Sequence, residues 1–214
     1  MRVKKFVLPV AGALLFVAVL FNADESRFPA SVRAVVRGLK LPLQIAALSA
    51  REPDAQIAVP VEGVRVGQIE DTWHAPRSGG RLHEGQDIFA RRGTIVRSAT
   101  EGYVIRVGEN QLGGNTVLIA GAGGRSYYYA HFDAYAPGLA VGDYVTPETA
   151  LGFVGTTGNA AGTAPHLHFG VYTPVAGAIN PLPLLQADRS GATTTDRFSE
   201  RLTRFKANRA SRRG

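Results

Sequence analysis

The sequence predicts an all-β domain over residues 59–185, built as two sheets or a partly open barrel and preceded by an N-terminal hydrophobic anchor helix. Short runs rich in Val, Thr and Tyr alternate with glycine turns throughout this region. The stretch "NTVLIAGAGGRSYYYAHF" places two such runs on either side of GAGG, which is typical of a β-hairpin. No apolar pattern between residues 60 and 185 indicates a helix longer than a turn or two.

Residues 1–26 are predicted to be a signal sequence or a signal anchor. Basic residues in "MRVKK" precede an uncharged apolar run over residues 6–21, which is typical of export. As a helix this run reaches about 24 Å, slightly less than the hydrocarbon thickness of about 30 Å, so length leaves cleavage and retention both open. A phenylalanine stands two residues before each candidate alanine at a cleavage site, and signal peptidase prefers a small residue there. We therefore expect a retained anchor, with its lysines in the cytoplasm and the rest of the chain outside.

Residues 27–58 are predicted to form a juxtamembrane helical segment and a linker. Apolar residues recur in "SVRAVVRGLKLPLQIAALSA" at near-helical spacing, and Gly38 and Pro42 predict a break that keeps the helix short. The pattern is compatible with a segment that lies on a membrane and with one that packs on the domain. The prolines and charges that follow indicate that the domain begins near residue 58.

The formal net charge of +7 comes from the two ends of the chain. Residues 1–5 carry three positive charges and the basic tail, residues 186–214, has a net charge of +5, so residues 6–185 have a net charge of −1. A nearly neutral domain gives no indication of a nucleic-acid partner. The composition of the tail favours a solvated, disordered end. The alternative is a basic amphipathic helix on an anionic membrane, for which the apolar spacing of Phe198, Leu202 and Phe205 is suitable.

The chain contains no cysteine and only five histidines. The absence of cysteine excludes disulfides, thiolate metal sites and cysteine nucleophiles. Two of the histidines, His166 and His168, are two residues apart on a predicted strand, so they share one face while Leu167 and Phe169 face the core. The ordinary interpretation of such a pair is a half-buried strand whose solvent-facing side is polar.

A second group of candidate ligands lies in "GGRLHEGQDIF". His83 and Asp87 are four residues apart, and imidazole nitrogen and carboxylate oxygen both bind zinc. Gly85 between them is expected to let the backbone curve so that the two side chains converge. A catalytic zinc site uses three protein ligands and leaves one position for water, and one histidine of the His166/His168 pair would complete the set.

His131 ends the predicted strand "YYYAHFD". Regular alternation predicts that Tyr127, Tyr129 and His131 share one face of this strand. If that face lines the same site, spare imidazoles are available there. Histidine is suited to take a proton from a metal-bound water near neutral pH and to give it to a leaving amine.

The stretches "RLHEGQDIFARRGTIV", "YYYAHFD" and "GTTGNAAGTAPHLHFGVY", followed by "INPLPLL", resemble peptidase family M23, the lysostaphin-type zinc endopeptidases of peptidoglycan. The resemblance covers residues 59–185, with the motifs in the family's order. It implies a β-sheet groove of the duplicated hybrid kind, a barrel-sandwich hybrid. It also implies that His83, Asp87 and His168 bind Zn2+ and that His131 and His166 form the catalytic pair.

The resemblance implies a zinc metallo-endopeptidase whose substrate is peptidoglycan, with D-Ala to diaminopimelate cross-links favoured over glycine bridges. The expected location is the periplasm or cell envelope, with an inner-membrane anchor. A regulatory protein partner is compatible with this setting. The alternative is a non-catalytic module of the same fold that binds the cell wall or activates an amidase. Because all five site positions are filled, we expect the active enzyme.

Other polar residues near these motifs receive weaker assignments. His74 matches no ligand position and is expected in an exposed loop. Glu84 is not in an H-E-x-x-H helix, so we expect it beside the ligands or facing solvent. Tyr129 and Arg81 are candidates for substrate contact, and the competing interpretation of Tyr129 is a cross-strand packing residue.

Overall fold

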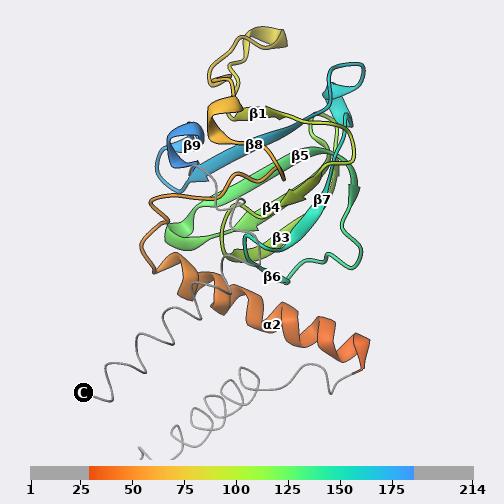
Figure 1. Ribbon diagram of the computed structural model, residues 1–214. Helices are drawn as coiled ribbons and strands as arrows, with labels where there is room; N and C mark the ends of the chain where they lie inside the picture. The colour runs from red at the N-terminus through yellow and green to blue at the C-terminus, as the bar shows by residue number, and fades with distance from the viewer. Residues whose placement is uncertain (1–28, 186–214) are drawn as a thin grey trace, which may run out of the picture.

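The computed structural model describes residues 29–185, and most of these residues form a curled β-sheet (Figure 1). Nine strands make up the sheet within this part of the chain, and its main path has the order β1-β8-β5-β4-β3-β6. The strands are β1 Gln86–Phe89, β2 Ile95–Arg97, β3 Gly102–Asn110, β4 Gly114–Ala120, β5 Ser126–Tyr135, β6 Tyr144–Val145, β7 Ala150–Val154, β8 His166–Thr173 and β9 Gly177–Ile179. Short 3-10 helices are η2 Val66–Gln68, η3 Ser78–Gly80, η4 Ala122–Gly124, η5 Gly158–Ala160 and η6 Leu182–Leu184. The predicted all-β domain is confirmed.

Antiparallel pairing of three neighbouring strands fixes which residues lie side by side. Strand β8 pairs with β1 on one side and with β5 on the other. In this register Asp87 is opposite His168, and His168 is in turn opposite Ala130. A carboxylate and an imidazole that are 81 positions apart in the sequence are therefore neighbours across one strand pair.

The core lies on the inner face of the curled sheet. Strand β8 alternates as predicted, because Leu167 and Phe169 are buried in the core cluster while His166 and His168 take the opposite face. Strand β7 pairs with both β2 and β5, which turns the sheet back over this core. Large aromatic side chains fill much of the interior, including Tyr127, Tyr129, Phe132 and Phe169.

One long helix, α2 (Ala30–Ser49), lies against the β-domain next to β3 and η4 (Figure 1). The helix continues through Gly38 and Pro42, so the predicted break is wrong. Tertiary packing explains the difference, because Val36 and Leu48 are buried on either side of Pro42 and hold both halves of the helix in place. Pro42 itself is exposed.

The predicted anchor and the basic tail lie outside the described residues. Within residues 29–185 no helix combines the length and the apolar character that crossing a bilayer requires.

Candidate metal centre and catalytic site

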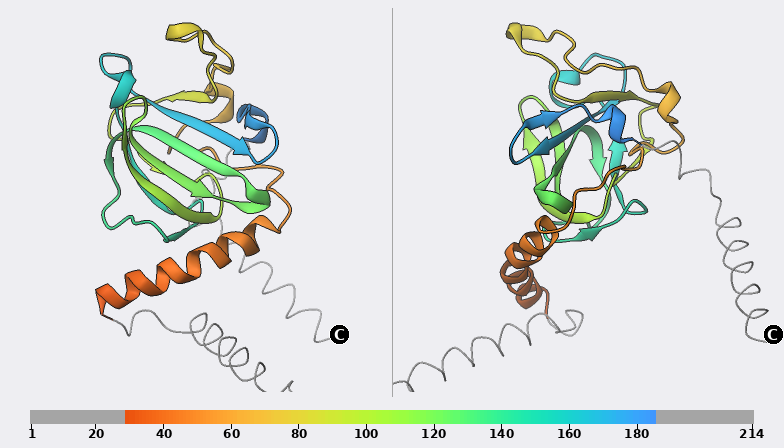
Figure 2. Two further views of the ribbon diagram at one scale, coloured as in Figure 1. Left: turned by 180° about the vertical axis from the view of Figure 1, so that it is seen from behind. Right: turned by 90° about the vertical axis from the view of Figure 1, so that its left-hand side faces the viewer.

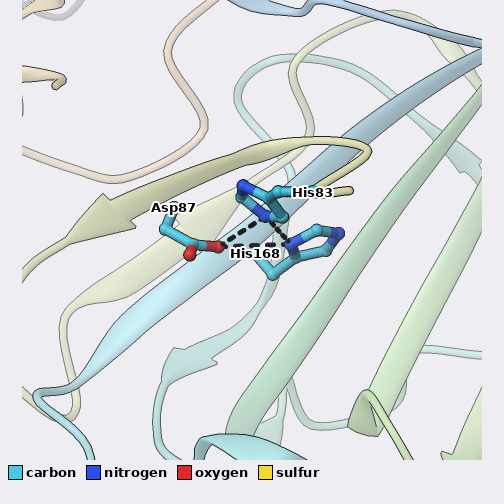
Figure 3. Close-up of side chains that lie close together, drawn as sticks. All are labelled: His83, Asp87 and His168. Carbon is cyan, nitrogen blue, oxygen red and sulfur yellow. Dashed lines mark hydrogen bonds and ion pairs between the residues drawn. The ribbon is translucent and has the colours of Figure 1, made fainter. Parts of the chain in front are cut away.

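Three side chains converge at the junction of β1 and β8 (Figure 3). His83 lies just before β1, Asp87 is on β1 and His168 is on β8. The His83 Nε2 atom is 2.8 Å from His168 Nδ1 and 3.1 Å from Asp87 Oδ1. His168 Nδ1 is 3.2 Å from the same carboxylate oxygen. The three predicted ligands therefore place their donor atoms within hydrogen-bonding distance of one another.

This donor set fits a zinc ion. With bonds of about 2.0–2.1 Å, two ligand atoms on a tetrahedral zinc are separated by roughly 3.3 Å, close to the separations found here. His83 Nδ1 lies 2.7 Å from the Thr72 carbonyl oxygen, which can only accept, so Nδ1 carries the proton and Nε2 presents a lone pair to the centre. Two imidazole nitrogens and one carboxylate oxygen are ligand types that zinc prefers.

The electrostatics of the centre favour the protonation states that a cation requires. Burial acts to raise the pKa of Asp87, but hydrogen bonds and charge from His168 and His83 hold that pKa well below its usual range. Burial lowers the pKa of His168, and the neighbouring Asp87 opposes this only in part. At neutral pH the carboxylate is therefore ionised and His168 is neutral. The Arg77 guanidinium forms an ion pair with the other oxygen of Asp87, Oδ2.

Sequence reasoning missed the residues that orient these ligands. The Thr72 hydroxyl accepts a hydrogen bond of 3.0 Å from the Asp87 backbone N–H, so Thr72 contacts two of the three ligands. Gln86 is fully buried, and its amide oxygen accepts hydrogen bonds from the Thr72 backbone N–H and hydroxyl. Its amide nitrogen donates to Asp71 and to Asn180, 2.8 and 3.0 Å away. One signal in the sequence could have identified Gln86. It lies two residues before Ile88, so a buried Ile88 places the Gln86 amide in the interior as well, where it requires hydrogen-bond partners.

His131 and His166 lie beside the three candidate ligands. Their ring centroids are 5.0 Å apart, and the His166 Nε2 atom is 3.8 Å from Asp87 Oδ1. His166 Nδ1 is 2.8 Å from the Ala164 carbonyl oxygen, and His131 Nδ1 is 2.8 Å from that of Thr157. Each Nδ1 therefore carries the proton of the neutral ring, which leaves Nε2 free to accept one. Burial lowers the pKa of His131 to about 4.

The predicted alternation of strand β5 is wrong at its functional end. Tyr127 and Tyr129 face the core, but His131 has a left-handed backbone, with φ of 67°, and pairing with β4 shifts register here. This bulge turns His131 to the site and returns Phe132 to the core. Tyr129 is a packing residue, since it is fully buried and its hydroxyl accepts a hydrogen bond from the Ala99 N–H.

Residues 81–181 match the family model of peptidase family M23. All five predicted site residues fall inside that match. These residues of the chain form an M23 peptidase domain.

Curated relatives of the M23 domain include two bacterial enzymes. The chain is 37% identical to the L-Ala–D-Glu endopeptidase of Bacillus subtilis, with 54% of this chain and 39% of that protein covered. It is 36% identical to the DD-carboxypeptidase/endopeptidase Mpg of Neisseria meningitidis, with 60% of this chain and 28% of that protein covered. The match therefore spans less than half the length of these relatives.

Solved structures also resemble the M23 domain. Helicobacter pylori Csd3 aligns with a TM-score of 0.50 and 31% identity, covering 73% of this chain and 42% of that one. A zinc-containing peptidase of Vibrio cholerae aligns with a TM-score of 0.50 and 26% identity, covering 64% of this chain and 40% of that one.

The residues with weaker assignments lie at the edge of the M23 site. His74 is exposed, as predicted, and its ring stacks on Trp73 with centroids 4.4 Å apart. Glu84 is exposed to solvent. Arg81 is exposed and bonds weakly to the Ser78 carbonyl oxygen, whereas Arg77 is the arginine that reaches the ligands. Nothing in the sequence alone separates these two arginines, because the turn between them decides which one points inward.

Gly85 serves the M23 site through close packing. A Cβ atom on Gly85 would lie 2.7 Å from His168 Cε1 and 2.8 Å from the Phe169 carbonyl oxygen. The expected contribution of Gly85 was backbone curvature. The structure adds that strand β8 and its imidazole approach so closely that a side chain has no room.

Proposed function

We propose that this protein is a zinc-dependent endopeptidase that hydrolyses peptide cross-links of bacterial peptidoglycan. The observation that carries the proposal is the convergence of His83, Asp87 and His168 next to two further histidines whose Nε2 atoms are free to accept a proton. The names of the curated relatives, L-Ala–D-Glu endopeptidase and DD-carboxypeptidase/endopeptidase, support peptide bonds of the cell wall as the substrate class.

The proposed site residues have two roles: three bind the metal and two transfer protons. His83, Asp87 and His168 would hold the zinc. When bound, zinc lowers the pKa of a coordinated water to about 7 and polarises the scissile carbonyl. In the neutral rings of His131 and His166 the Nδ1 proton is bonded to a backbone carbonyl, so either Nε2 can take a proton from the attacking water. The resulting imidazolium can donate a hydrogen bond to the oxyanion, and it can then transfer its proton to the leaving amine.

The proposal also covers the fold type of the domain, its cellular location and the bond that it cuts. The curled sheet is taken as the duplicated barrel-sandwich hybrid of the M23 family. The apolar run at residues 6–21 is taken as an uncleaved inner-membrane anchor that leaves the domain in the periplasm. Of the possible bonds we favour the D-Ala to diaminopimelate cross-link, which the similarity to a DD-endopeptidase supports.

Purified sacculi provide the test. The full chain, incubated with sacculi, should reduce the cross-linked muropeptide dimers, and a zinc chelator should abolish the loss. His83→Ala should lose both zinc and activity, whereas His166→Ala should keep about one zinc per chain and lose turnover. His74→Asn is the matched control and should behave as the parent protein. The His74 ring is exposed and stacks on Trp73, its backbone N–H that bonds to His83 is kept, and asparagine tolerates its left-handed backbone.

Two outcomes would contradict the proposal. Stoichiometric zinc in His83→Ala would refute the ligand assignment. Unchanged sacculi from a parent protein that carries one zinc would favour the non-catalytic alternative, a module that binds the wall or activates an amidase. Addition of an amidase to the same assay would then test for activation.

A further inference from the structure

Helix α2 carries a stripe of exposed apolar side chains, which we call the apolar stripe: Val32, Val35, Leu39 and Leu43. Their exposed fractions are 40%, 62%, 56% and 49%. They recur at intervals of three and four residues, so they share one side of the helix. An ordered set of large apolar side chains on one surface is unusual for a soluble face and indicates an interaction site.

A second side of α2, about a third of a turn from the apolar stripe, is occupied by the β-domain. Val36 and Leu48 are buried against the β-domain, and the Arg37 Nη1 atom lies 2.7 Å from Asp143 Oδ1. The helix is therefore held on the domain by one side while the apolar stripe beside it stays exposed. Within residues 29–185 no segment covers the stripe.

The charge and the position of α2 favour a lipid surface as the occupant. The helix contains no acidic residue. Of its three basic residues, Arg33 is half-buried, Arg37 pairs with Asp143 of the domain and Lys40 is buried. The apolar run at residues 6–21 precedes it, and residues 22–29 connect the two. Eight residues span at most about 29 Å, so an anchored run would keep α2 near the membrane surface.

The position of the M23 site agrees with such a placement. Strand β1, which carries Asp87, lies at the end of the β-domain opposite α2 in all three views (Figures 1 and 2). A membrane against the apolar stripe would therefore leave the site accessible from the side that faces the wall.

We propose that α2 lies flat on a bilayer with anionic headgroups, with its apolar stripe in the headgroup and acyl boundary, and so holds the M23 domain with its site directed away from the membrane. Amphipathic helices with apolar residues on one face and basic residues elsewhere bind such interfaces. This inference depends on the proposed anchor for proximity but on no catalytic residue.

The chain's lack of cysteine makes a position-specific test straightforward. Single-cysteine variants Val35→Cys, Leu39→Cys and Leu43→Cys of the full chain carry a polarity-sensitive fluorophore. Leu112→Cys and Val175→Cys are controls, because their side chains are also exposed, at 50% and 98%, but belong to the β-domain. All variants are reconstituted into phosphatidylcholine vesicles with and without phosphatidylglycerol.

The three stripe positions should shift to shorter emission wavelengths, be quenched by spin-labelled lipid and lose several-fold in quenching by aqueous iodide. The two control positions should keep full iodide quenching. Equal iodide access at all five positions would overturn the proposal. Protection of the stripe positions without vesicles that grows with protein concentration would instead assign the stripe to a second copy of the chain. Leu39→Asp should remove the lipid signal at position 43 while muropeptide release in solution stays unchanged.

Discussion

His131 is held in an unusual backbone conformation so that its imidazole reaches the site. Its φ is 67°, its backbone N–H donates to the Gly113 carbonyl oxygen at 2.8 Å, and its Nδ1 lies against Thr157. Non-glycine residues adopt this left-handed conformation at some energetic cost, which neighbouring hydrogen bonds must offset. The position of the ring is therefore set by the bulge in β5 rather than by regular strand geometry.

The buried His131 makes stability depend on pH in a defined direction. Burial lowers its pKa to about 4, whereas an unfolded histidine has a pKa of about 6.5. Above pH 6.5 the ring is neutral in both states and contributes nothing. As the pH falls from about 6.5 to about 4, the unfolded chain binds a proton that the folded chain does not, so stability is lost across this interval.

Melting temperatures of metal-free protein between pH 7 and pH 4 check this. The parent protein should lose more stability over the interval than His131→Asn, which cannot titrate. Asparagine is chosen because it tolerates the left-handed region better than most residues. Parallel pH profiles for the two proteins would show that His131 is protonated in the folded state and that its environment is not as described.

Residue types and spacing were enough to predict that His83, Asp87 and His168 converge, but not which face of its strand each residue takes. His166 and His168 share a face because β8 is regular, so a period of two gave the correct result. Tyr129 and His131 are also two residues apart but do not share a face, because a bulge adds one residue to the strand. No pattern in "YYYAHFD" indicates this bulge. A bulge depends on pairing with the neighbouring strand, which a single strand's sequence does not contain.

The junction of β1 and β8 is the element on which the site depends most directly. Asp87 and His168 are opposite each other in this pair, and Gly85 lets the strands approach. Thr72, itself hydrogen-bonded to Gln86, contacts two of the three candidate ligands, His83 and Asp87. The contribution of Thr72 could not be foreseen, because its backbone carbonyl and hydroxyl act through a loop whose path follows from the fold.

Replacing Gly85 with alanine should damage the junction selectively. The new Cβ would press on His168 and on the Phe169 carbonyl, and overpacking of this kind costs about 1–3 kcal/mol. Displacement of His168 should also weaken zinc binding, by roughly tenfold or more. Zinc affinity is measured by competition with a chromogenic chelator, and folding by circular dichroism.

Gly67→Ala is the matched control for this substitution. A Cβ on Gly67 meets nothing within 4 Å, so zinc affinity should stay that of the parent protein. If Gly85→Ala retained parental zinc affinity and stability, the two strands would have more freedom to separate than their packing indicates.

Helix α2 shows how element boundaries depend on tertiary contacts. Gly38 and Pro42 lower intrinsic helix propensity, which led to the prediction of a break. Packing of Val36 and Leu48 against the domain overrides that preference. The all-β prediction succeeded for the opposite reason, since glycine turns and β-branched runs are local signals that the fold does not contradict.

At the scale of the whole molecule, the centre joins distant parts of the chain. His83 and His168 are 85 positions apart, yet their nitrogens lie 2.8 Å from each other. The strand order β1-β8-β5 brings together the start of the domain, its middle and its end. A metal bound here would therefore connect segments that separate on unfolding, and its binding energy would add to global stability.

Removal of the metal should lower the melting temperature of the full chain. A ligand that binds only the folded state at a free concentration of 100 Kd stabilises it by about 2.7 kcal/mol, and for a protein of this size 1 kcal/mol shifts Tm by about 2–4 °C. Chelator treatment should thus lower Tm by roughly 5–10 °C, and added Zn2+ should restore it. Mg2+ should not, because it prefers oxygen ligands in octahedral geometry.

The ligand variant gives this prediction its control. His83→Ala removes one nitrogen donor, so its melting temperature should be the same with zinc and with chelator. A zinc-dependent shift that persists in His83→Ala would show that the metal is held elsewhere. A parent protein whose Tm is indifferent to both zinc and chelator would show that this convergence of two imidazoles and a carboxylate does not bind the metal. Within residues 29–185, the ion pair with Arg77 would then stabilise the ionised Asp87.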